Sequence, residues 1–144
     1  MRIIFYSTDN LHGMLFLILE KGLKQGTKFN VFFSTEFECE DFSRAFWNSS
    51  SALPHGLFSD GFYEMQPILV LTHEQYLLCK QHVGVQKDCA IFVQVDHEAK
   101  SWEKICYINI SNEILKKIVS KYNGAHVQNW SFQNSHWQKI ESIL

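Results

Sequence analysis

The sequence predicts an α/β fold, in which a mostly parallel sheet lies between two layers of helices. Short apolar runs alternate along the chain with segments whose apolar residues recur every three to four positions, which is the pattern of βαβ units. The chain has 144 residues, the length of one domain, and 46% of them are hydrophobic, enough for a core that needs no disulfides. We therefore expect residues 1–144 to form a single three-layer, Rossmann-like domain.

The predicted elements follow one another with short turns. The expected strands are residues 2–6, 28–33, 68–71, 89–95 and 105–110. The expected helices are residues 11–24, 35–47, 73–82, 97–103 and 111–122. Several helix ends carry ordinary signals: Thr35 and Glu38 have the spacing of a capping box, Ser111 is a good N-cap, and Gly26 can take the left-handed conformation that ends a helix.

Two segments show no clear period. Residues 48–67 contain Phe, Tyr, Leu and Met side chains among two prolines and two glycines. Long irregular segments are uncommon and tend to be functional, so this one is either a partner contact or a loop folded over its own core. Residues 125–144 fit either an edge strand or a terminal helix.

Composition argues against several classes of function. The 13 Lys and Arg residues oppose 15 Asp and Glu residues, a net charge of −2, so the chain has no overall positive field for nucleic-acid phosphates. The four cysteines lack the spacing of a zinc site or a redox dithiol, which favours free thiols. The longest apolar run has six residues, too few for a bilayer span or a signal peptide. We expect a cytoplasmic protein without a metal or other cofactor.

The sequence contains no convincing catalytic motif. The turn after the first expected strand has one glycine where a dinucleotide fingerprint needs three, and no Gly-Lys-Ser/Thr phosphate loop occurs. Asp96 and His97 end an expected strand, where catalytic groups often lie, but we interpret them as the solvated start of a helix. Asp9 and His12 are interpreted as a helix cap and a surface histidine, and His55 as a residue that bonds loop backbone.

Charge is unevenly distributed along the chain. The first 97 residues have 11 acidic and 7 basic side chains, whereas the remainder has six lysines and four acidic residues. On the last expected helix, Lys117 and Lys121 lie beside the apolar stripe that starts at Ile114, and Lys116 lies further round. A basic rim beside an apolar face fits a short peptide with acidic residues and one apolar anchor. The alternative is an ordinary amphipathic helix with solvated lysines.

Three motifs occur in an order typical of one protein family. They are FSRAFW at residues 42–47, LPHG at residues 53–56 and QPILVL at residues 66–71. In these motifs, in the opening strand and in the Leu115–Ile118 helix segment, the chain resembles the chi subunit of bacterial DNA polymerase III. The resemblance covers about residues 3–132.

The resemblance implies a chi-like α/β domain with no catalytic activity of its own, which takes part in DNA-directed DNA synthesis only within the holoenzyme. Chi subunits bind the psi subunit of the clamp-loader complex and the acidic, Phe-ending C-terminal tail of single-stranded DNA-binding protein. The positions that correspond to the psi contact are Trp47, Leu53, Pro54 and His55. The positions that correspond to the tail contact are Lys116, Lys121 and Tyr122.

We therefore expect a non-catalytic adaptor in DNA replication that bridges these two proteins. Two alternatives come from other classes of protein. One is a small nucleotide-dependent enzyme that uses the pocket at the carboxyl ends of the strands. The other is a self-associating structural domain, with residues 48–67 as the contact between copies.

Overall fold

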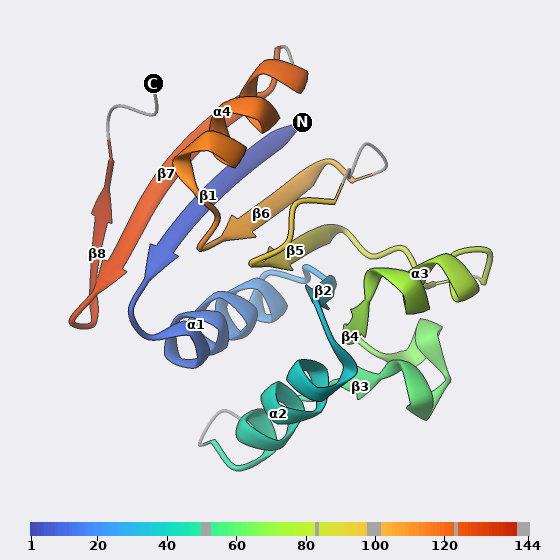
Figure 1. Ribbon diagram of the computed structural model, residues 1–144. Coiled ribbons are helices and arrows are strands. Elements are labelled where there is room, and N and C mark those ends of the chain that lie inside the picture. The colour runs from blue at the N-terminus through green and yellow to red at the C-terminus, as the bar shows by residue number, and fades with distance from the viewer. Residues whose placement is uncertain (50–52, 83, 98–101, 123, 141–144) are drawn as a thin grey trace.

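The computed structural model describes residues 1–49, 53–82, 84–97, 102–122 and 124–140, and it confirms the α/β fold. Its strands are β1 (Arg2–Thr8), β2 (Phe29–Phe33), β3 (Gly56–Leu57), β4 (Ile68–Thr72), β5 (Cys89–Val93), β6 (Lys104–Ile108), β7 (His126–Gln133) and β8 (His136–Lys139). Its α-helices are α1 (Leu11–Lys24), α2 (Glu36–Trp47), α3 (His73–Cys79) and α4 (Asn112–Lys121) (Figure 1). Two short 3₁₀ helices are η1 (Phe58–Asp60) and η2 (Tyr63–Met65).

All eight strands belong to one sheet, in the order β3-β4-β2-β5-β6-β1-β7-β8. Every neighbouring pair is parallel except β7 and β8, which are antiparallel. The inner strands β2, β4 and β5 are buried along their whole length, as expected where helices cover both faces of a parallel sheet. Since α1 to α4 each follow a parallel strand, all four helices start at the same edge of the sheet.

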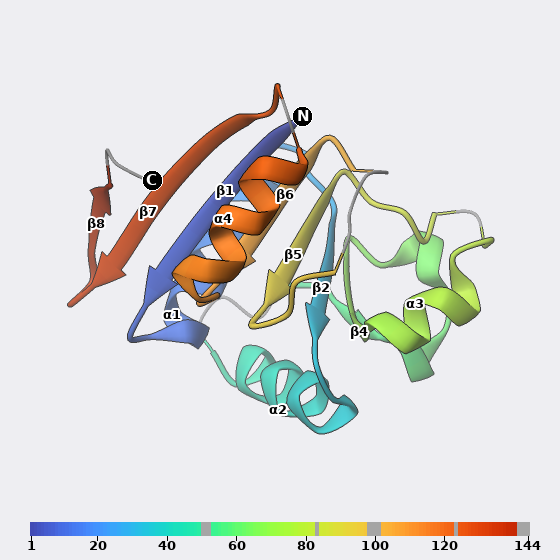
Figure 2. The same cartoon turned by 45° about the horizontal axis from the view of Figure 1, so that its top comes forward.

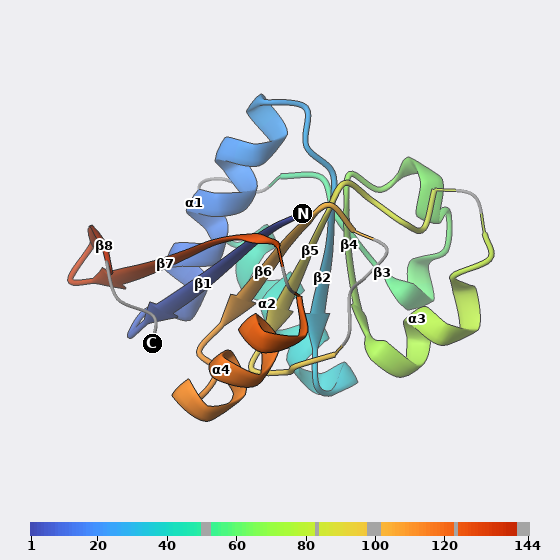
Figure 3. The ribbon, with the colours of Figure 1, turned by 90° about the horizontal axis from the view of Figure 1, so that it is seen from above.

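The helices divide into two layers, one on each face. In one core cluster, α1 and α2 pack on Ile4 of β1 and Val31 of β2. In the other, α3 and α4 pack on Ile3 and Phe32, the residues next to these two on the same strands. This alternation follows from the two-residue period of a strand. Figure 3 shows α1 and α4 on opposite sides of the strands, and Figure 2 shows α4 crossing in front of β1 and β6. Surfaces on α2 and on α4 are thus separated by the sheet.

The helix starts follow the capping chemistry expected from the sequence. Thr35 Oγ1 accepts a hydrogen bond from the amide of Glu38 (3.2 Å), and Ser111 Oγ accepts one from the amide of Ile114 (3.3 Å). In α1 the expected cap Asp9 is wrong: the cap is Asn10, because it is Asn10 Oδ1 that accepts a hydrogen bond from the amide of Gly13 (3.1 Å). These bonds satisfy amide groups that the first turn of a helix leaves without a partner.

The expected helix at residues 97–103 is wrong for the residues described. His97, Trp102 and Glu103 are not helical, and residues 98–101 lie outside the described part. The reason lies in packing: the Trp102 side chain is buried, and its Nε1–H donates to Asn30 Oδ1 on β2 (3.3 Å). Tertiary contacts of this kind override the weak helix propensity of a short segment.

Some element ends also differ from the sequence-based expectation. The strand expected at 89–95 ends at Val93, because Gln94 has a φ of 59°, a left-handed conformation that breaks the ladder. The helix expected to reach His82 ends at Cys79, whose carbonyl accepts the amide of His82 in a turn (2.9 Å).

The two segments without a clear period are both partly regular. Of residues 48–67, residues 48–49 and 53–67 are described and include the short β3, η1 and η2, and residues 50–52 lie outside the described part. The C-terminal segment forms the β7–β8 hairpin, so the edge-strand alternative is confirmed for residues 126–139. Its two-residue turn, Asn134–Ser135, has φ values of 51° and 62°, as in the type I′ turns that suit hairpins. None of the helices in the described ranges is long and apolar enough to span a membrane.

Candidate functional site

Four residues predicted from the resemblance to contact a partner lie together at the end of α2. The indole of Trp47 lies against the imidazole of His55, with ring centroids 4.3 Å apart, and the Phe46 ring is 4.9 Å from the same imidazole. Trp47 is 52% exposed and Pro54 is exposed, Leu53 packs partly against the core, and His55 is buried. We call Trp47, Leu53, Pro54 and His55 the Trp47 surface. An exposed indole held on a rigid base is typical of protein–protein contacts.

His55 holds this surface in place through two hydrogen bonds. Its Nδ1–H donates to the carbonyl of Leu53 (2.9 Å), and the Ser43 hydroxyl donates to its Nε2 (2.8 Å). A carbonyl can only accept, so the Leu53 contact places a proton on Nδ1, whereas the Ser43 hydroxyl could donate to a neutral Nε2 or accept from a protonated one. Burial lowers the pKa of His55, which favours the neutral ring and therefore donation by Ser43. The structure confirms that His55 bonds loop backbone.

The Ser43–His55 contact has the reach of a nucleophile–base pair. However, Ser43 is 7% exposed and His55 is 5% exposed, so the hydroxyl does not face solvent. The other ring nitrogen bonds a carbonyl rather than a carboxylate, whereas a catalytic histidine is commonly oriented by an acid. The role of the pair is therefore structural: Ser43 helps to hold the His55 ring against Trp47.

The second predicted region forms a hollow beside α4, with a volume of about 150 Å³. We call it the α4 hollow. It is lined by Asp96, His97, Tyr107, Ile114, Lys117, Ile118, Lys121 and Tyr122. Two of the three residues that the resemblance assigns to the tail contact, Lys121 and Tyr122, are among them. Lys116 is exposed and does not line the hollow, because it lies about 200° round the helix from Ile114. Lys117, which lies about 300° round the helix from Ile114, lines the hollow instead.

The α4 hollow combines an apolar wall with a net positive rim. Ile114 and Ile118 supply the wall, and the lining includes two ammonium groups, those of Lys117 and Lys121, and one carboxylate, that of Asp96. Lys117 also lies 4.0 Å from Glu113, in an ion pair whose two side chains are largely exposed; such a pair contributes little. The arrangement suits an apolar side chain that carries a carboxylate close by.

The far wall of the α4 hollow comes from the loop after β5. The Tyr107 hydroxyl on β6 donates to the backbone carbonyl of His97 (3.2 Å), and the imidazole of His97 stacks on that of His73 at 4.0 Å. Burial, together with the neighbouring His97, lowers the pKa of His73. Asp96 and His97 therefore border the hollow as part of the loop after β5, and neither residue is helical.

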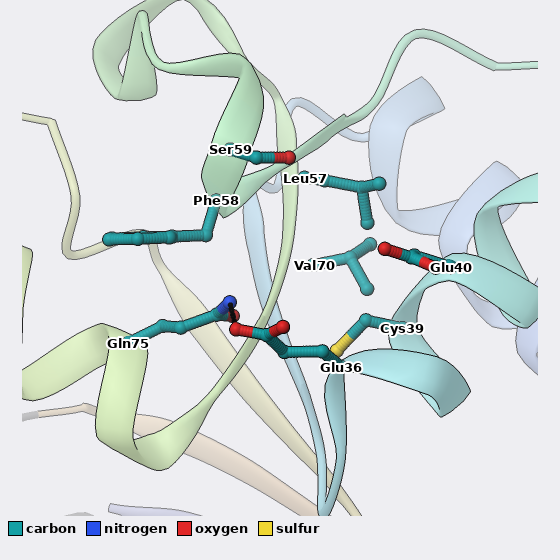
Figure 4. Close-up of a pocket in the computed structure, with 8 residues that line it drawn as sticks. All are labelled: Glu36, Cys39, Glu40, Leu57, Phe58, Ser59, Val70 and Gln75. Carbon is teal, nitrogen blue, oxygen red and sulfur yellow. Dashed lines mark hydrogen bonds between the residues drawn. The ribbon is translucent and has the colours of Figure 1, made fainter.

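A second hollow, of about 230 Å³, lies between α2 and the β3–η1 segment, and we call it the α2 hollow. It is lined by Glu36, Cys39, Glu40, Leu57, Phe58, Ser59, Val70 and Gln75. Figure 4 shows the Glu36 carboxylate pointing toward Gln75 and the Glu40 carboxylate on the side of Val70 nearest Leu57, with the Phe58 ring across the space. The sequence alone does not predict this site. The only signal was the four-residue spacing of Glu36 and Glu40, which places both on one face of the helix.

The turn where a nucleotide would bind is filled by hydrogen bonds within the chain. The amide of Thr8 donates to Asn109 Oδ1 (2.9 Å), and the amide of Asn10 donates to Thr8 Oγ1 (2.9 Å). The amide of Gly13 donates to the cap at Asn10. A phosphate at a helix N-terminus is held by such amides, so here a phosphate would have to displace these bonds. His12 packs on Phe42 at 5.7 Å and shows no hydrogen bond to Asp9 in the described structure.

The cysteines show no reactive setting. All four are free and buried. Burial raises the pKa of the Cys39 thiol to about 12. Cys89 and Cys106, on adjacent strands, have their sulfurs 3.9 Å apart, with full burial of both side chains. In the parts of the chain that the structure describes, no three His, Cys, Asp or Glu side chains gather as metal ligands would.

Comparison with known proteins assigns no family: no family model matches the chain, and no curated protein matches it.

Proposed function

We propose that the chain is a non-catalytic adaptor of the chi type, an accessory subunit of the bacterial DNA polymerase III clamp-loader complex. In this proposal the Trp47 surface binds the psi subunit. The α4 hollow binds the acidic, Phe-ending C-terminal tail of single-stranded DNA-binding protein. The adaptor is then a cytoplasmic component of DNA replication that acts only by holding two proteins together.

The observation that carries the proposal is the placement of the two surfaces. The Trp47 surface belongs to the α1–α2 layer, and the α4 hollow belongs to the α3–α4 layer on the other face of the sheet. Two partners can therefore be bound at the same time without meeting. A weak contact on one face becomes effective when the other face already holds the adaptor at the site of replication.

The chemistry of the α4 hollow fits the proposed tail. Ile114 and Ile118 offer an apolar wall to the terminal Phe ring, and Lys117 and Lys121 face the terminal carboxylate and the acidic residues before it. Charge-assisted hydrogen bonds to carboxylates are stronger than neutral ones. Ammonium groups at an exposed rim are screened by salt, so the contact weakens as ionic strength rises.

The test is a titration of the full chain with a fluorescently labelled peptide that has three aspartates and a C-terminal Phe, followed by fluorescence anisotropy at 20 and 300 mM salt. We expect saturable binding that weakens with salt. Lys121→Glu removes one exposed pair of about 0.5–1 kcal/mol and adds a repulsion of similar size, so the dissociation constant should rise about tenfold.

Lys116→Glu is the matched control, because it makes the same charge change on the same helix outside the α4 hollow. It should change the dissociation constant less than about threefold. An amidated peptide, which lacks the terminal carboxylate, should bind more weakly. The proposal fails if the acidic peptide does not bind at 20 mM salt, or if Lys116→Glu and Lys121→Glu weaken binding equally.

A further inference from the structure

The α2 hollow has an apolar floor and an acidic rim. Leu57, Phe58 and Val70 come from β3, η1 and β4 and form the floor, while Glu36 and Glu40 project from successive turns of α2. No lysine or arginine lines the hollow among the residues that the structure describes. A volume of about 230 Å³ is enough for one long side chain and too small for a folded element.

One of the two carboxylates is held in a fixed position. The Thr72 amide donates to Gln75 Oε1 (2.9 Å), and Gln75 Nε2 donates to Glu36 Oε1 (2.9 Å). Figure 4 shows this second bond at the edge of the space. A carboxylate can accept about four hydrogen bonds, so Glu36 keeps acceptor positions for a ligand. Its orientation needs no reorganisation when a ligand arrives, which favours binding.

The charges around the α2 hollow are not neutralised by nearby ion pairs. The ion pairs seen in the described part of the chain join Glu20 to Lys24 and Glu113 to Lys117, and neither is at this site. The N-terminus of α2 carries a partial positive charge of about half a unit. Glu36 and Glu38, both in the first turn, outweigh it, so the local field attracts a cation.

We propose that the α2 hollow binds an arginine side chain presented by a protein partner. The aliphatic stem would lie on Leu57 and Phe58, which are partly exposed, and the guanidinium group would contact the carboxylates of Glu36 and Glu40. A planar guanidinium has five donors in a fork that suits carboxylates. An apolar stem with a charged head matches an apolar floor with a charged rim.

The glutamates of the α2 hollow and Trp47 lie on the same face of α2. At 100° per residue, Glu36, Glu40 and Trp47 lie at 0°, 40° and 20° on α2, so they share a face. Glu40 and Trp47 are seven residues apart, a rise of about 10 Å. If a partner docks on Trp47, as proposed above, the same partner reaches the hollow with an arginine about 10 Å away. Arginine binding itself does not depend on that proposal.

The test uses the full ¹⁵N-labelled chain and two peptides, acetyl-Leu-Arg-Leu-amide and its citrulline counterpart, which has the same shape but no charge. Amide signals of Cys39, Glu40, Leu57 and Ser59 should shift with the arginine peptide. Its dissociation constant should be at least fivefold lower than that of the citrulline peptide. The double variant Glu36→Gln, Glu40→Gln should abolish this preference.

Asp41→Asn is the matched control, since Asp41 is exposed on α2 about 140° from Glu36 and outside the hollow. It should keep the preference for arginine. Equal binding of the two peptides, an absence of shifts at millimolar peptide, or unchanged binding in the double variant would overturn the assignment. None of these results bears on the binding of an acidic peptide at the α4 hollow. The arginine proposal and the adaptor proposal can therefore be refuted independently.

Discussion

His55→Ala removes the ring that supports Trp47, and its cost can be worked out from the contacts. The change deletes the imidazole packed 4.9 Å from Phe46 and 4.3 Å from Trp47, and it leaves the Leu53 carbonyl without its donor. An unsatisfied buried group costs about 1–3 kcal/mol, and the lost ring adds a cavity cost of similar size. Ser43 can turn its hydroxyl to another acceptor, so we count its bond as no loss.

We therefore expect His55→Ala to lower the free energy of unfolding by about 3 kcal/mol, which corresponds to about 6–12 °C in Tm for a domain near this size. Urea unfolding followed by circular dichroism measures the loss. Exposed His126→Ala is the control and should change stability by less than about 0.5 kcal/mol. A loss below about 1 kcal/mol in His55→Ala would refute the supporting role assigned to this ring.

The same variant carries a pH signature. Because burial lowers the pKa of His55 in the folded chain, the unfolded chain takes up this proton first as pH falls below about 6.5. Stability of the wild type therefore falls with pH in that range, by at most about 1.4 kcal/mol per unit for this proton. His55→Ala lacks this loss, so its deficit should be smaller at pH 5.5 than at pH 7.5. An equal deficit at both pH values would contradict the lowered pKa.

Three further predictions concern the core. Asn30→Leu should lower the free energy of unfolding, measured in urea, by about 2–4 kcal/mol. The buried side-chain amide of Asn30 donates to the Val85 carbonyl (2.7 Å) and accepts from the Lys87 amide (3.0 Å). An unchanged free energy of unfolding would contradict these bonds. Gly22→Ala should destabilise by about 1–3 kcal/mol, because an added Cβ would lie 2.2 Å from the Phe29 ring, and an unchanged Tm would show that the contact relaxes freely. A thiol reagent at pH 8 should react with none of the four buried cysteines within minutes and with all four in denaturant; rapid reaction of the native chain would disprove their burial.

Much of the fold was predictable because local patterns decide it. The change from a two-residue to a three- or four-residue apolar period separates β1 from α1, and the capping residues Thr35 and Ser111 set the starts of α2 and α4. The sequence wrongly predicts Trp102 and Glu103 as helical, because the burial of Trp102 depends on Asn30, 72 residues earlier in the chain. Contacts at that separation leave no periodic signal.

Periodicity predicted site residues only where one element supplies them; the Trp47 surface, which joins the end of α2 to residues 53–55, came from the resemblance. The angular position of Lys117 on α4 correctly placed it beside the apolar stripe, whereas the resemblance favoured Lys116, which the structure places outside the α4 hollow. Tyr107 was missed because its part in the hollow depends on how β6 and the loop after β5 come together. The α2 hollow draws on four separate segments, and no pattern in the sequence predicts that assembly.

The central claim is that this chain works by binding an acidic, Phe-ending peptide on one face of its sheet and another partner on the opposite face. The most direct measurement is an amide chemical-shift map of the full ¹⁵N-labelled chain with that peptide at low salt. We predict saturable shifts confined to His97, Tyr107 and residues 114–122, with the Trp47 signals unmoved. An absence of saturable shifts, or shifts centred on Trp47, would contradict the account.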